Sequence, residues 1–80
     1  MNEARLKKAF ENALKITVNE INNVIEFNSI KNWDSIGHME LIVSIEQEFD
    51  IIIDDDDVMD LTSFAKAKEI LSSYGIDFSA

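Results

Sequence analysis

Residues 32–42 read NWDSIGHMELI and set the architecture expected for the rest of the chain. An Asp-Ser-aliphatic triplet stands directly before an apolar pattern with helical spacing. Asp34 is the expected N-cap, because its carboxylate can accept a hydrogen bond from amides one turn into the helix. The first amides of a helix are unpaired, and the helix dipole adds positive partial charge there. Ser35 therefore stands where a helix can hold a phosphate ester.

The helix that starts at Ser35 is expected to extend to about residue 50, and it carries two apolar lines. The inward stripe consists of His38, Leu41, Ile42, Ile45 and Phe49. The second, narrower line consists of Ile36, Met39 and Val43. This second line fits either the edge of the core or a surface that meets a protein partner.

Composition points to a small acidic protein. The 80 residues suffice for one domain, residues 1–80, with a modest core. Proline is absent and only two glycines are present, which favours helices over sheets with many turns. The formal net charge of −9 disfavours nucleic acid and anionic membranes and favours partners with basic patches. No apolar run is long enough to span a membrane and the first residues lack an apolar signal segment, so we expect a cytoplasmic protein without membrane insertion. We also expect it to be a monomer.

The chain offers few groups for catalysis or metal binding. It has no cysteine, which excludes disulfides, a thiolate nucleophile and cysteine metal sites. His38 is the only histidine, and without a Ser-His-Asp arrangement we expect it to pack beside Trp33. The acidic run at residues 54–57 lacks the spacing of a calcium-binding EF-hand loop, so no metal site is expected.

The segments before Asp34 comprise a helix and a long connection. The helix is expected over about residues 3–16, and its inner face consists of Leu6, Phe10, Ala13 and Leu14. The connection, residues 17–33, has apolar members that indicate packing against the core: Ile21, Val24, Ile25, Phe27, Ile30 and Trp33. The last three of these are three residues apart and could form one tight turn.

The chain after residue 50 adds two further helices. Ile51–Ile53 has no partner strand, so we interpret it as an extended link that buries one or two side chains. A short helix is expected over about residues 55–60, with acidic residues at its N-terminus, where the helix dipole favours them. A last helix is expected over about residues 63–74, with a cap at Thr62 or Ser63 and Gly75 as its stop signal. The whole pattern predicts an all-α fold.

The chain resembles bacterial acyl carrier proteins over nearly its whole length, and without gaps from residue 34 to about 69. The shared features are the Asp-Ser-Ile triplet, the Glu-Leu pair at residues 40–41, the Glu-Gln-Glu-Phe-Asp end at 46–50, the aliphatic link, the acidic short helix and the Thr-Ser cap. The resemblance implies a four-helix bundle with a long first loop and a short third helix.

The same resemblance implies that Ser35 accepts 4'-phosphopantetheine from coenzyme A through a phosphopantetheinyl transferase. In the family, the residue equivalent to Asp34 is thought to help hold the transferase and its metal. The arm ends in a thiol that carries cargo as a thioester. The protein would therefore be a carrier and not an enzyme, and its sulfur would arrive with the arm.

The resemblance also implies a surface that meets acyl-loading and acyl-transfer enzymes. Its apolar members are Ile36, Met39 and Val43. Its acidic members are Glu40, Glu46, Glu48, Asp55 and Asp56. Each carboxylate alone is an ordinary solvated charge, but together they can steer partners with basic patches.

Several positions depart from the carriers of fatty-acid synthesis. Gly37 and Gln47 stand where those carriers have acidic residues, and Asp54 stands where a proline often starts the third helix. Together with Trp33 and His38, these features are similar to small carriers of specialised pathways, such as surface glycan or secondary-metabolite assembly. Acyl cargo in lipid metabolism or in such a pathway is expected, and D-alanyl or peptidyl (aminoacyl) cargo is the alternative. An unmodified acidic helical adaptor is the alternative outside the carrier class.

Overall fold

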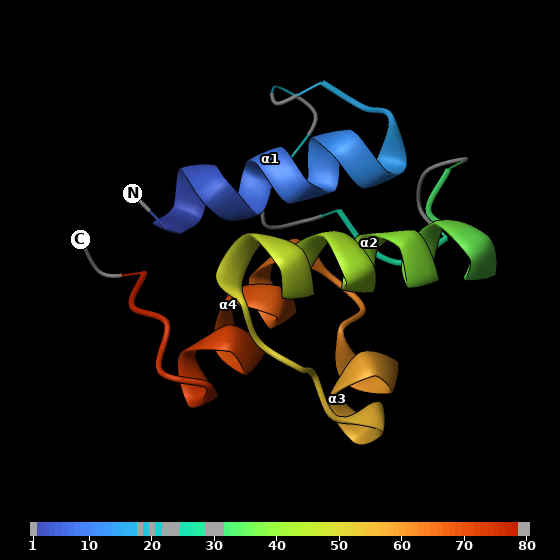
Figure 1. The fold of residues 1–80 in the computed structure, drawn as a ribbon. Helices are drawn as coiled ribbons and strands as arrows, with labels where there is room; N and C mark the ends of the chain where they lie inside the picture. The colour runs from blue at the N-terminus through green and yellow to red at the C-terminus, as the bar shows by residue number, and fades with distance from the viewer. Residues whose placement is uncertain (1, 18, 20, 22–24, 29–31, 79–80) are drawn as a thin grey trace.

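The computed structural model describes residues 2–17, 19, 21, 25–28 and 32–78 (Figure 1). Four α-helices follow one another: α1 (Asn2–Leu14), α2 (Ser35–Phe49), α3 (Asp55–Asp60) and α4 (Phe64–Ser73). The only strand-like pairing within these ranges is an isolated bridge between Glu26 and Ser63. The predicted all-α fold with four helices, a long first loop and a short third helix is thus confirmed.

Helices α1 and α2 end slightly earlier than predicted. Lys15 has a φ of 58°, which is left-handed, so α1 stops two residues short of the expected end at residue 16. Asp50 has a φ of 54° and acts as the C-cap of α2, and its amide bonds to the carbonyl of Glu46. A residue in the left-handed conformation at a helix end helps to satisfy carbonyls that the last turn leaves free. Glycine is the usual residue at this position, but α1 uses Lys15 and α2 uses Asp50.

Helix α4 has well-defined signals at both ends. The Ser63 hydroxyl accepts from the Lys66 amide at 2.9 Å, so Ser63 is the N-cap and the predicted choice between positions 62 and 63 is resolved. Gly75 has a φ of 90°, and the Ile76 amide reaches back to the Leu71 carbonyl at 3.2 Å. This pattern is a Schellman motif, in which glycine takes the left-handed position without steric cost.

Helices α1 and α2 lie side by side, with α3 below α2 in the view of Figure 1. Helix α4 packs against α1 as well, since Phe64 of α4 contacts Phe10 of α1. Phe10 is at the centre of the core between these helices. Its ring meets Trp33 edge-to-face at 5.3 Å and Phe64 at 5.1 Å between centroids. Each such pair contributes about 0.5–1.5 kcal/mol beyond simple burial. Other fully buried side chains around it are Leu6, Leu14, Leu41, Ile45, Leu61 and Leu71.

The two connections pack as expected where the structure describes them. Ile21, Ile25 and Trp33 of the first loop are buried. The predicted turn involves Ile30, which lies outside the described residues, as does Val24, so that turn stays a prediction. In the link after α2, Ile53 is buried whereas Ile52 is 83% exposed.

Gly37 allows the first loop to lie directly against the first turn of α2. The Asn32 side chain donates to the carbonyl of Leu14 at 2.8 Å and so joins the loop to the end of α1. A Cβ built on Gly37 would lie 1.9 Å from the backbone oxygen of Asn32. No larger residue fits at position 37 unless the loop moves.

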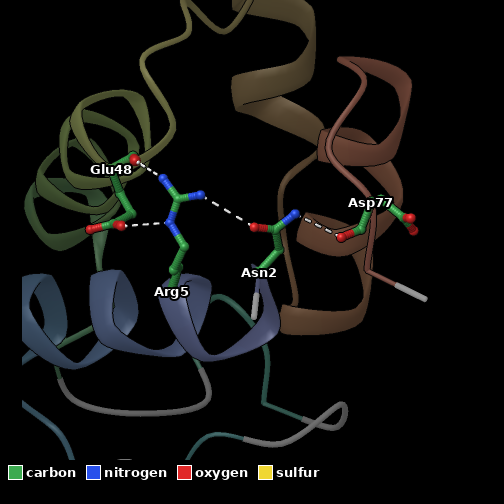
Figure 2. Close-up of polar contacts among 4 residues, drawn as sticks. All are labelled: Asn2, Arg5, Glu48 and Asp77. Carbon is green, nitrogen blue, oxygen red and sulfur yellow. Dashed lines mark hydrogen bonds and ion pairs between the residues drawn. The ribbon is translucent and has the colours of Figure 1, made fainter. Parts of the chain in front are cut away.

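Polar contacts tie the N-terminal turn of α1 to three other segments. Arg5 donates to both the carboxylate and the backbone carbonyl of Glu48 at the end of α2 (Figure 2). Asn2 accepts from Arg5 and donates to the Asp77 carbonyl at 2.8 Å, which holds the C-terminal segment (Figure 2). Lys68 of α4 donates to the Glu3 carboxylate at 3.0 Å.

The contact at Gly37 leads to a test of stability. Alanine is ordinarily the better helix residue by about 1 kcal/mol. We expect Gly37→Ala to lower the free energy of unfolding instead, by about 1–3 kcal/mol, because the new methyl group overlaps the Asn32 carbonyl. Thermal melts followed by circular dichroism measure this. Gln47→Ala, at an exposed site of the same helix, is the control and should leave the melting temperature nearly unchanged. A rise in melting temperature for Gly37→Ala would contradict the contact.

The ion pair between Glu3 and Lys68 makes stability depend on pH. The hydrogen bond from Lys68, its positive charge and the charge of Lys7 lower the pKa of Glu3 from its ordinary value of 4.5, against a smaller effect of burial. The pair therefore stabilises the fold above pH 4.5, and this stabilisation is lost as the pH falls through the lowered pKa. Because the pair is partly exposed, the effect is small.

A double-mutant cycle of Glu3→Gln and Lys68→Met isolates this pair. We expect a positive coupling at neutral pH that disappears in acid, measured from melting temperatures at each pH. A coupling that is the same at both pH values would show that the charge on Glu3 is not its source.

Candidate functional site

Ser35 is the first residue of α2 and its side chain is exposed. Asp34 precedes it as the predicted N-cap, and its carboxylate accepts from the Gly37 amide at 2.9 Å. The backbone carbonyl of Asp34 also accepts from the His38 amide at 2.8 Å. The hydroxyl of Ser35 is thus presented at a capped helix N-terminus, where added negative charge is favoured.

A cleft of about 480 Å³ opens beside Ser35. Its lining residues come from the first loop, α2, α3 and the turn after α3: Phe27, Ser35, His38, Met39, Val58, Met59 and Thr62. Apolar side chains predominate among them, and the volume falls in the range of about 300–1,000 Å³ that is typical of small-molecule sites. An apolar group attached at Ser35 could therefore lie in this cleft.

His38 forms one side of the cleft and joins three elements. Its Nδ1 accepts from the buried Trp33 indole at 3.0 Å. Its Nε2 lies 2.8 Å from the Val58 carbonyl of α3, and because Nδ1 accepts, Nε2 is the nitrogen that donates. The rings of Trp33 and His38 are also nearly parallel, with centroids 6.3 Å apart. As predicted, His38 packs beside Trp33.

Comparisons with known proteins agree with this geometry. Residues 4–71 match the family described as "Phosphopantetheine attachment site". The chain is also 35% identical over 71 residues to an acyl carrier protein of Buchnera aphidicola subsp. Schizaphis graminum, covering 89% of this chain and 90% of that protein. The chain belongs to the acyl carrier protein family. The resemblance inferred from residues 34–69 is thereby confirmed.

Membership of this family determines the cofactor and the type of activity. The group is 4'-phosphopantetheine, and the protein acts as a carrier and not as an enzyme. The residues present suit such a group, since an exposed serine hydroxyl at a helix N-terminus stands next to an apolar cleft. When bound, the group supplies the thiol that the chain itself lacks.

The narrower apolar line of the carrier's α2 is exposed. Ile36 is 74%, Met39 56% and Val43 47% exposed, which favours a surface that meets partners over the edge of the core. Glu40 is exposed on the same side of the helix, since it lies four residues from Ile36 and three from Val43. Asp55 and Asp56 are exposed at the start of α3.

Two acidic residues of the predicted surface are held by the carrier's own fold. The carboxylate of Glu46 accepts from the Ile53 amide at 2.9 Å. Glu48 binds Arg5 at 2.9 Å on the side of α2 that faces α1 (Figure 2). Two residues correspond to about 200° around a helix, so Glu46 and Glu48 point to nearly opposite sides. The structure does not bring Glu48 together with Glu40 or the exposed apolar line.

Some site residues were not predicted from the sequence. Met59 is 77% exposed and lines the cleft together with Phe27 and Thr62. Met59 is an apolar residue within an acidic short helix, and that contrast is the signal that could have identified it. Phe27 was interpreted only as a loop residue that packs on the core.

Two further observations concern the described part of the chain. It contains no group of three or more acidic or histidine side chains arranged to hold a metal ion. None of its helices is long and apolar enough to cross a membrane.

The placement of the acidic residues leads to a test with a pair of charge reversals. Glu40→Lys should slow association with a basic partner such as a phosphopantetheinyl transferase, and added salt should reduce the difference from wild type. Glu48→Lys makes the same charge change about 80° around α2 and about 12 Å along it from Glu40, at a carboxylate that Arg5 binds, so its association rate should stay closer to wild type. Its melting temperature should fall because the contact with Arg5 is lost. Stopped-flow association and thermal melts measure both effects. Equal slowing by the two reversals would show that net charge, and not this side of α2, governs association.

Proposed function

We propose that Ser35 is the attachment residue and that the chain carries acyl groups as thioesters on a 4'-phosphopantetheine arm. The observation that supports this most directly is the position of the Ser35 hydroxyl, which is exposed at the N-terminus of α2 and borders the apolar cleft. The family match spans residues 4–71 and so includes this position.

The proposed modification requires only a nucleophile from the chain. The Ser35 oxygen forms a bond to phosphorus in the pyrophosphate of coenzyme A, and the bond to the departing nucleotide breaks. The transferase supplies the base that takes the hydroxyl proton. The product is a phosphodiester at the start of α2, where the helix dipole offsets its negative charge by about 0.3–1 kcal/mol.

The neighbouring residues take supporting roles in this proposal. Asp34 caps α2 and contributes to the recognition of the transferase and its metal. The partner surface comprises Ile36, Met39, Glu40, Val43, Glu46, Asp55 and Asp56. Glu48 is left out, because Arg5 occupies its carboxylate and its backbone carbonyl.

The apolar lining of the cleft favours acyl over aminoacyl cargo, since a charged amino group would lose hydration there without a partner.

A specialised pathway rather than general fatty-acid synthesis is proposed from Gly37 and His38. Gly37 accommodates the Asn32 carbonyl, and His38 bridges Trp33 and α3. The cytoplasmic location and the monomeric state stay predictions.

Attachment is tested by intact mass. Incubation with coenzyme A and a phosphopantetheinyl transferase should add one phosphopantetheinyl group to the wild type and none to Ser35→Ala. Ser44→Ala, on the same helix, is the control and should be modified like the wild type. Modification of Ser35→Ala would contradict the assignment, and an unmodified wild type would support the adaptor alternative.

Asp34→Asn separates two roles in the same assay. Asparagine caps helices about as well as aspartate, so the melting temperature should stay close to wild type. The transfer rate should fall if the carboxylate recognises the transferase and its metal. An unchanged rate would show that Asp34 serves only as the cap.

A further inference from the structure

The cleft beside Ser35 ends at the imidazole of His38, which is held by two hydrogen bonds. We refer to this side chain as the barrier. His38 lines the open cleft and binds the fully buried Trp33 behind it, and the Phe27 ring meets the imidazole in a T-shaped arrangement at 5.4 Å between centroids. The imidazole also spans the space between α2 and α3 through its contact with the Val58 carbonyl. Any group that moved from the cleft towards the core along this route would have to displace His38.

Displacing His38 would break two hydrogen bonds at once. Both ring nitrogens are engaged, one with the Trp33 indole and one with the Val58 carbonyl. Trp33 is 0% exposed, so its N–H would lose its partner in a place that water does not reach. The barrier is therefore held in place by the core behind it as well as by α3.

The two methionine walls of the cleft are of a different kind. Met39 and Met59 are 56% and 77% exposed and have flexible, polarisable side chains that adapt to the shape of a bound group. The cleft can thus change shape on its solvent side, whereas His38 is held in place on the side of Trp33.

We propose that His38 is a specificity-determining residue that keeps acyl cargo in the open cleft and out of the core. This inference rests on the proposed attachment at Ser35. The cargo class that fits is a short or compact acyl group, which can lie within the cleft volume of about 480 Å³. In a longer acyl chain, the carbons that extend beyond the cleft would stay in water. Lengthening the chain would therefore bury little additional apolar surface.

Trp33 is the natural reporter for the test, because it is the only tryptophan and lies directly behind His38. Wild-type protein is loaded with butanoyl, octanoyl or dodecanoyl phosphopantetheine from the corresponding coenzyme A thioesters, and loading is verified by intact mass. The Trp33 indole N–H resonance and the fluorescence maximum are then compared with the unacylated arm-bearing form. Both should stay unchanged across the series, while the methyl resonances of Met39 and Met59 should shift already with butanoyl.

Three variants separate the barrier from the walls. His38→Ala should open the route, so dodecanoyl loading should shift the Trp33 signals and raise the melting temperature relative to butanoyl loading. His38→Gln retains one acceptor and one donor and should behave like the wild type. Met59→Ala changes a wall only, so it should leave the Trp33 signals independent of chain length.

The inference about His38 and the proposed attachment at Ser35 are tested by different measurements. A wild-type protein that shows no mass increase would refute the attachment at Ser35, whereas the Trp33 signals test the role of His38. Trp33 signals that move with chain length in the loaded wild type would overturn the barrier, and this holds even if His38→Ala does not fold. A folded, loaded His38→Ala whose Trp33 signals ignore chain length would overturn it as well.

Discussion

The burial of Trp33 is the interaction on which the rest of the structure depends. Its ring meets Phe10 of α1, and its N–H binds the imidazole of His38 on α2. His38 in turn holds the Val58 carbonyl of α3. Together, Trp33 and His38 link α1, α2 and α3, and Trp33 stands directly before Asp34, which caps the helix that begins at Ser35. The core and the site are consequently parts of the same packing arrangement.

Most of the fold could be predicted from the sequence because its signals are local. The helical spacing of the apolar residues, the cap at Asp34 and the stop at Gly75 each act within about one turn, and the structure shows all of them. The end of helix α1 was predicted two residues too late, because nothing in the sequence marks Lys15 as left-handed. A lysine has no special preference for that conformation, which here follows from how the chain turns after Leu14.

The site was predictable only in part, because its remaining features come from contacts between distant segments. Ser35 follows from its motif, but the close approach of Asn32 to Gly37 depends on how the loop lies on α2. Likewise, Glu46 and Glu48 look like surface charges in the sequence. The structure gives one to the Ile53 amide and the other to Arg5, 43 positions away. Helical spacing alone shows which residues share a side of a helix. It does not show which distant group binds each carboxylate.

The contacts of Asn2 have a consequence for handling the molecule. They hold the segment around Asp77 beside the start of α1, and Arg5 holds the start of α1 against Glu48, at the end of α2 that is remote from Ser35 (Figure 2). A 15-residue helix is about 22 Å long. A label or a solid support attached at an exposed position beside these contacts therefore stands about a helix length away from Ser35. Protein immobilised there would leave the Ser35 end of α2 open to large enzymes in the surrounding solution.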